Sequence, residues 1–321
     1  MNTNTILLKL LSYKWVKKVV AWLRKLVLPF FDGVPLFDVL VYFIKGLVKG
    51  ELSIRAAALS YNFFMALFPL ILFFFTIIAY LPLDAYIPVA YDFIAEMVPA
   101  QAYESVMNTI NGILTKNGTL LSISIIFTFY FATRGIRAMI KTFNDSYHTL
   151  ESRSGIMQIV ISLMLLLVIT IMIILVFTAI IINKQLFISI VSNTTINIIV
   201  WKWIFGFSKW ILVVLFMFFS ISLIYYLAPA KKSRFRFFSA GSSLATALII
   251  LSSFGFDFYI SNFSNYNAVY GSIGTLIIVL VWIQLISMIL IIGFELNASI
   301  KNAKRRKQMK STDPLKLYTQ K

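Results

Sequence analysis

The sequence contains no cysteine and a single histidine, His148, among its 321 residues. Disulfide bonds and thiolate metal sites are therefore excluded, as are zinc sites and catalytic schemes that need several histidines. No Walker loop, dinucleotide-binding fingerprint, H-E-x-x-H or G-x-S-x-G motif occurs, so the sequence indicates no cofactor. These absences remove the common enzyme classes and predict a protein that is not an enzyme.

Charged residues are also scarce. They make up 13% of the chain, whereas 60% is hydrophobic and the mean hydropathy is +0.88. An ordinary soluble surface needs about twice that share of charge. The 30 Phe and 15 Tyr suit lipid-facing helices with aromatic belts at the membrane surfaces. The composition predicts an integral membrane protein.

The few charges are mostly positive, with 29 Lys and Arg against 12 Asp and Glu. In a soluble chain this excess suggests a nucleic-acid partner, but in membrane proteins basic residues mark the cytoplasmic segments. All but four of them fall in residues 1–55, 134–155, 229–236 and 301–321. This alternation predicts that both termini are cytoplasmic. It also predicts that the basic segments bind anionic lipid headgroups. No specific nucleic-acid partner is expected.

Six apolar segments separate the basic ones. Residues 56–81 carry no charged side chain and exceed the roughly 20 residues that cross a hydrocarbon core, so they predict the first span. The other predicted spans are residues 117–133, 156–182, 203–228, 237–260 and 271–298. The second is barely long enough, but without it every later basic segment would change sides. Residues 183–202 are expected to form a short polar outer loop.

The N-terminal region has a different pattern. Trp15, Val19 and Trp22 recur at helical spacing among basic residues, which predicts an amphipathic helix on the cytoplasmic leaflet. Residues 36–47 predict a second interfacial helix. The expected fold is therefore all-α, a six-helix transmembrane bundle with amphipathic interfacial helices. Its parts are a basic N-terminal region (1–50), a membrane domain (51–300) and a basic cytoplasmic tail (301–321).

Ionisable side chains within the spans are candidates for function because they are costly in lipid. Asp257 is predicted near the outer end of span five and Glu295 near the inner end of span six, which excludes a direct carboxylate dyad. Glu295 has two interpretations: a structural ion pair that joins helix ends, or a cytoplasmic gate or headgroup site. The candidate inner polar site consists of Arg55, Asn62, Arg134, Arg137 and Glu295.

Other polar and small residues suggest packing roles. Gln284 lies near the middle of span six, where an interhelical hydrogen bond is expected and a pore-lining role is the alternative. Asp257 is interpreted as a solvated helix end or as part of an outer mouth. Gly241 and Ala245 at the start of span five predict close helix packing. Tyr225, at the inner end of span four, is interpreted as part of an aromatic belt.

Several short motifs resemble, in their order and spacing, the YihY/virulence factor BrkB family of bacterial inner-membrane proteins. They are Arg55-Ala56-Ala57-Ala58-Leu59-Ser60-Tyr61, Phe68-Pro69, Phe143-Asn144, Tyr226-Leu227-Ala228-Pro229, Tyr270-Gly271-Ser272-Ile273-Gly274 and Gly293-Phe294-Glu295-Leu296-Asn297-Ala298. The resemblance covers roughly residues 45 to 300. It implies a six-span helical bundle in the bacterial cytoplasmic membrane, and it implies no agreed activity.

Some family members once carried the label ribonuclease BN. This chain lacks the paired carboxylates or histidine cluster that a nuclease needs on a solvated surface. The predicted function is a multi-pass membrane protein that transports or handles a lipid-like or small solute. The alternative is a structural or envelope-organising membrane protein without a translocation path. Membrane lipids are the expected partners, and further copies of the same chain are a second candidate.

Overall fold

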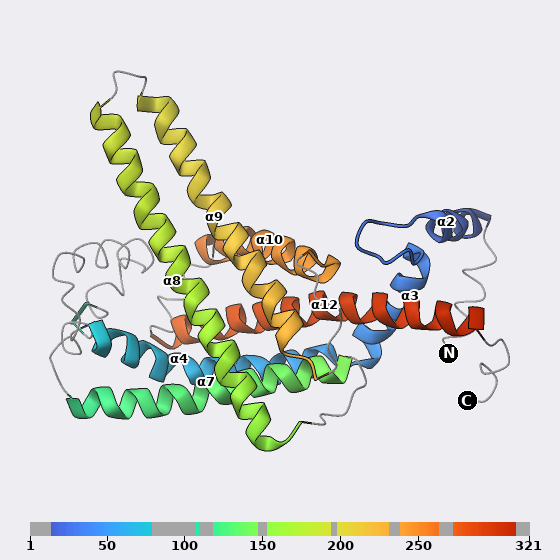
Figure 1. Ribbon diagram of the computed structural model, residues 1–321, viewed down its shortest axis with the longest axis horizontal. Coiled ribbons are helices and arrows are strands. Elements are labelled where there is room, and N and C mark those ends of the chain that lie inside the picture. Colours follow the sequence, from blue (N-terminus) through green and yellow to red (C-terminus); the bar gives the residue numbers. More distant parts are fainter. Residues whose placement is uncertain are drawn as a thin grey trace.

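The computed structural model describes residues 14–78, 107–108, 118–146, 153–193, 198–230, 238–262 and 272–312. Within these ranges the regular structure is helical, without strands (Figure 1). Six of the described helices are long and apolar enough to cross a membrane. The all-α fold with six candidate spans is therefore confirmed. The single histidine, His148, lies outside the described residues.

The spans are formed by long helices that follow one another along the chain. They are α4 (Leu52–Ile78), α7 (Gly118–Ser146), α8 (Gly155–Asn193), α9 (Ile198–Leu227), α10 (Ala240–Asn262) and α12 (Ser272–Thr312). Two shorter helices, α2 (Lys14–Lys25) and α3 (Leu36–Lys49), precede them. The two short helices occupy the predicted segments, and their position on a membrane surface stays a prediction.

Two helix boundaries differ from those expected. Residues 183–193 and 198–202 are helical, so the prediction of an outer loop over residues 183–202 was wrong for these positions. Apolar residues such as Leu186 and Ile188 continue the lipid-facing pattern of α8, and Lys184 is exposed on the helix surface. Asn183 Nδ2 also donates to Ser208 Oγ at 2.6 Å and joins α8 to α9. The predicted boundary between the membrane domain and the basic tail, at residues 300 and 301, falls inside α12.

The long helices form two groups. In Figure 1, α4, α7 and α12 run alongside one another, and α10 packs on α12. Helices α8 and α9 run side by side, cross the first group and leave it at one end. Exposed apolar side chains cover much of α8 and α9, as lipid-facing helices require.

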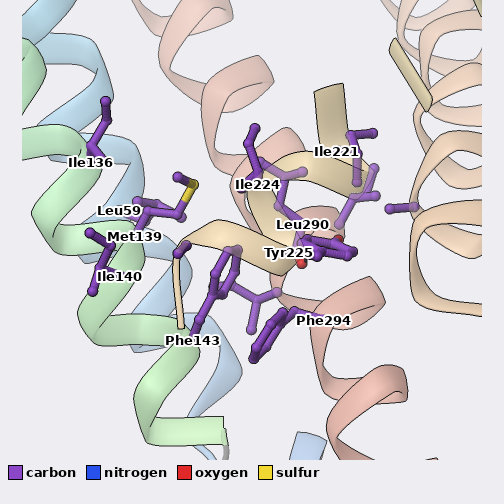
Figure 2. Close-up of a cluster of buried hydrophobic side chains, with 14 of the residues drawn as sticks. Leu59, Ile136, Met139, Ile140, Phe143, Ile221, Ile224, Tyr225, Leu290 and Phe294 are labelled. Atoms are coloured by element: carbon purple, nitrogen blue, oxygen red, sulfur yellow. Dashed lines mark hydrogen bonds between the residues drawn. The ribbon is translucent and has the colours of Figure 1, made fainter. Parts of the chain in front are cut away.

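The hydrophobic core lies where α4, α7, α9 and α12 meet (Figure 2). Phe143 of α7 and Phe294 of α12 stack with ring centroids 4.2 Å apart, and the ring of Tyr225 meets both edge-on at 5.5 Å. The Tyr225 hydroxyl donates to Leu290 O at 2.7 Å. Tyr225 is 6% exposed, so its interpretation as an aromatic-belt residue was wrong. A tyrosine in an aromatic belt places its hydroxyl in the headgroup region, whereas the Tyr225 hydroxyl binds a backbone carbonyl inside the bundle.

Helices α10 and α12 approach closely at two glycines, as the small residues predicted. A Cβ atom on Gly241 would overlap Gly293 O, and one on Gly293 would lie 2.7 Å from Gly241 O. Asn297 Oδ1 accepts a hydrogen bond from Gly241 N at 2.8 Å, and Asn297 Nδ2 donates to Ser239 Oγ at 3.0 Å. Asn297 thus satisfies one of the free backbone donors at the start of α10.

The loop between α2 and α3 docks on the last turns of α12. Phe31 and Val34 are buried there in a second cluster that includes Ile300 and Ala303. Lys304 Nζ forms an ion pair with Asp32 Oδ2 at 3.0 Å. The N-terminal region and the C-terminal part of α12 therefore form one packed unit.

Candidate functional site at a buried ion pair

Several helix ends converge at one end of the bundle, which is called the basic end below. Here α4 and α10 begin and α7 and α9 end. Asn144 Oδ1, near the end of α7, accepts a hydrogen bond from Ala230 N just after α9 at 2.8 Å. Arg153 Nη2, just before α8, donates to Ala228 O at 3.1 Å. Side chains near two of these helix ends therefore bind the backbone that follows α9.

A buried ion pair lies at the basic end. Arg55 Nη1, in the first turn of α4, is 3.9 Å from Glu295 Oε2 on α12. The two side chains are 14% and 7% exposed. This separation exceeds a hydrogen bond, so the attraction between these two atoms is mainly Coulombic. Because each charge has lost most of its water, the pair is costly to build and adds little net stability.

Arg55 also contacts the backbone and a hydroxyl on neighbouring elements. Its Nη1 donates to Gly50 O at 3.3 Å, and its Nη2 donates to Thr142 O and, at 2.6 Å, to Ser146 Oγ. The Nε atom is buried and has no hydrogen-bond partner among the described residues. The guanidinium thus links the end of α3, the start of α4 and the end of α7.

Helix α3 covers the ion pair with two glycines. A Cβ atom on Gly46 would overlap the Glu295 carboxylate, and one on Gly50 would lie 3.0 Å from Arg55 Nη1. Gly50 is the C-cap of α3, four residues after Gly46, so both glycines lie on the side of the helix end that faces the ion pair. Any larger side chain at Gly46 would displace either the carboxylate or the helix.

The other members of the predicted inner site lie elsewhere. Asn62 Nδ2 donates to Ala58 O within α4 at 2.7 Å. Arg134 and Arg137 are exposed on α7, and neither contacts Arg55 or Glu295 in the described part of the chain. The structure thus brings together Arg55 and Glu295, and it places the two arginines of α7 on a different face.

Gln284 forms a polar contact deeper in the bundle. Ser60 Oγ of α4 donates to Gln284 Oε1 of α12 at 2.7 Å, so the expected interhelical hydrogen bond is present. Asp257 is exposed near the far end of α10, well away from Glu295 at the basic end. In the described ranges, no group of three or more His, Cys, Asp or Glu residues is placed to hold a metal ion.

Four residues around the ion pair were not predicted: Gly46, Gly50, Thr142 and Ser146. The spacing Gly46-x-x-x-Gly50 ahead of the first span was a visible signal, because this pattern lets helices approach closely. Thr142 contributes a backbone carbonyl, which carries no sequence signal. Ser146 shares its residue type with many surface positions, so only the folded arrangement identifies it.

Comparisons with known proteins agree with this fold. The family described as Virulence factor BrkB matches residues 43–315, which is most of the chain and includes the whole ion-pair site. The chain belongs to this family. The resemblance found in the sequence motifs is therefore confirmed, and the protein is a multi-pass membrane protein of this family.

Three relatives illustrate the spread of the family. The chain is 32% identical over 260 residues to a Bacillus subtilis (strain 168) protein named as ribonuclease-like, YfkH, with 78% of this chain and 90% of the relative covered. It is 24% identical to the UPF0761 membrane protein NTHI0384 of Haemophilus influenzae, covering 80% and 93%. It is 27% identical to the UPF0761 membrane protein MS0032 of Mannheimia succiniciproducens, covering 78% and 85%. No solved structure matches the chain.

Proposed function

We propose that this protein is a non-enzymatic component of the bacterial cytoplasmic membrane that moves or handles a lipid-like or small solute. Its basic end faces the cytoplasm, because the helix ends there carry Arg55, Lys141 and Arg153, and basic residues beside membrane spans stay cytoplasmic. The solute binds at the inner site formed by Arg55 and Glu295. Gln284, on α12 like Glu295, contributes a polar group deeper in the bundle.

The observation that supports this proposal is the buried pair itself. Two charges removed from water cost several kcal/mol each, and apolar side chains of similar volume pack as well or better. Arg55 Nη1 and Glu295 Oε2 are 3.9 Å apart, and Arg55 Nε has no described partner. A guanidinium with an unused donor suits a phosphate or carboxylate, which it binds through paired hydrogen bonds. Charged groups kept in a membrane segment at such a cost are candidates for a functional site.

A second function is favoured by a different observation. Polar side chains in the bundle interior bind one another, as Gln284 does with Ser60 and Arg55 with Ser146. An envelope-organising protein without a translocation path needs only such internal contacts. In that case the ion pair locks helix ends together, and a neutral substitute of the same shape suffices.

Complementation of a deletion strain distinguishes the two functions. Wild type and Glu295→Gln would be expressed at matched membrane abundance, and the lipid and metabolite profiles of the cells compared with the parent strain. Glu51→Gln is the matched control, because Glu51 is an exposed carboxylate close to the same helix start. Solute handling predicts that Glu51→Gln restores the profile and that Glu295→Gln does not. A wild-type profile in cells carrying Glu295→Gln would exclude the inner-site proposal.

A further inference from the structure

Helix α7 has two faces of different chemistry. Ile136, Met139, Ile140 and Phe143 point into the bundle core (Figure 2). Another face carries Arg134, Arg137 and Lys141, which are all exposed. Spacings of three and four residues place these cations in one line along the helix. The three residues are called the α7 basic track below.

The track lies on a helix that is a candidate membrane span, toward its basic end. Helix α7 is apolar enough to cross a membrane over Leu121–Ser146, and the track falls within that range. Gly135, beside Arg134, faces Phe63, because a Cβ atom on Gly135 would lie 3.3 Å from Phe63 Cδ1. Phe63 is eight residues beyond Arg55 along α4, or about 12 Å deeper from the basic end. Arg134 is therefore well below the level at which the span begins.

The cations of the track have no partners among the residues that the structure describes. None of the three makes a hydrogen bond, ion pair or ring contact with another residue in the described ranges. Charged side chains in membrane segments normally pair with each other or with backbone carbonyls, and many of them mark substrate or ion pathways. The three exposed side chains are therefore open to a ligand from outside the chain.

Apolar and aromatic side chains continue the line of the track away from the basic end. Tyr130 is four residues before Arg134 and is 59% exposed, and the neighbouring Phe127 is 51% exposed. A molecule that contacts both parts needs an anionic group near the basic end and an apolar body extending into the membrane. Anionic phospholipids have this shape, whereas free phosphate offers only the charge.

We propose that the α7 basic track binds the headgroup of an anionic phospholipid, whose acyl chains lie along the exposed apolar part of α7. The inference rests on the proposed function, since it names the class of molecule that the protein handles. The track lies on a face of α7 that is separate from the Arg55–Glu295 pair. The lipid therefore reaches the track from the side of the bundle, within the membrane.

Lipid binding can be measured on the purified full-length protein in detergent. The probe is a fluorescent phosphatidylglycerol, displaced by unlabelled phosphatidylglycerol, phosphatidylcholine or inorganic phosphate. The test variant carries Arg134→Gln, Arg137→Gln and Lys141→Gln. The control carries Lys184→Gln and Lys209→Gln, two exposed cations that lie outside the basic segments. Elution volume on size exclusion confirms that each variant is folded.

The track variant should weaken phosphatidylglycerol binding by about tenfold or more, because three cations near an anionic headgroup act together. The control should stay within about twofold of wild type. Arg134→Lys with Arg137→Lys should retain most of the affinity, which shows that charge and not shape is recognised. Unlabelled phosphatidylcholine should displace the probe poorly.

Three results would overturn the proposal: equal losses in the track and control variants, equal competition by phosphatidylcholine, or competition by inorganic phosphate as strong as by phosphatidylglycerol. The Glu295→Gln variant separates this inference from the proposed function. If Glu295→Gln fails to complement while the track variant binds lipid as wild type does, only the track proposal is wrong. If the track variant loses binding while Glu295→Gln complements fully, only the inner-site proposal is wrong.

Discussion

Replacing Arg55 by Met should destabilise the protein much more than replacing Glu295 by Gln. Met has a similar length but no charge, so Arg55→Met removes the cation that lies 3.9 Å from the Glu295 carboxylate, whose side chain is 7% exposed. Removing one partner of a buried pair typically costs about 3–5 kcal/mol. The change also removes the hydrogen bond from Arg55 to Ser146 Oγ. We expect a loss of about 4 kcal/mol in the free energy of unfolding.

The double variant should recover part of this loss. Two charges 3.9 Å apart attract by about 4 kcal/mol at an effective dielectric constant of 20, and desolvation of both charges offsets most of that gain. With Arg55→Met and Glu295→Gln together, neither charge remains. The residual cost is then the lost Arg55 hydrogen bonds, about 1–2 kcal/mol. Glu295→Gln alone should cost about 1–3 kcal/mol, because Arg55 keeps its other acceptors.

Equilibrium unfolding in mixed micelles of a mild detergent and dodecyl sulfate, followed by circular dichroism, gives the four free energies of this cycle. The reasoning predicts a coupling energy of at least about 2 kcal/mol between the two sites. Single-variant costs that add within about 0.5 kcal/mol would refute it, since additivity means that the two side chains do not interact.

The same unfolding assay checks three further changes, with Gly255→Ala as the control. Gly→Ala inside a helix usually stabilises by about 1 kcal/mol. We expect this gain for Gly255→Ala, because a Cβ atom on Gly255 would meet open space. Gly46→Ala should instead destabilise, because the new methyl group overlaps a carboxylate of the ion pair; a gain like that of the control would contradict the covering role of α3. Gly241→Ala should also destabilise by forcing α10 and α12 apart, and unchanged stability would disprove their close contact. Asn297→Ala should cost about 0.5–2 kcal/mol through loss of the α10 cap, and a neutral result would argue against that cap.

The sequence predicted the membrane fold well because the deciding signals are local. Apolar length and the alternation of basic segments follow from the cost of burying charge in lipid, and that cost acts on each segment separately. The same rule erred at residues 183–193 and 198–202, where a few polar side chains suggested a loop. A helix longer than the hydrocarbon core can carry Lys184 beyond the apolar region, so polarity alone does not end it.

The candidate site was predictable only in part. Arg55 and Glu295 were recognised because ionisable groups in spans are rare. Sequence depth estimates also placed Arg134 and Arg137 near them, but depth gives no information about which face of a helix a residue occupies. That face is set by packing, as shown by Ile136 and its neighbours, which turn the two arginines outward. Tyr225 was misplaced for the same reason.

The length of α12 has a mechanical consequence. This helix runs unbroken from Ser272 to Thr312, and its 41 residues extend about 60 Å, twice the thickness of a hydrocarbon core. It passes the ion pair at Glu295 and ends beside the N-terminal loop that Lys304 holds. If α12 moves as a rigid body, a tilt of about 10° around Glu295 displaces its C-terminal end by about 4 Å. Force applied to the basic tail is thereby delivered to the residues that cross the membrane.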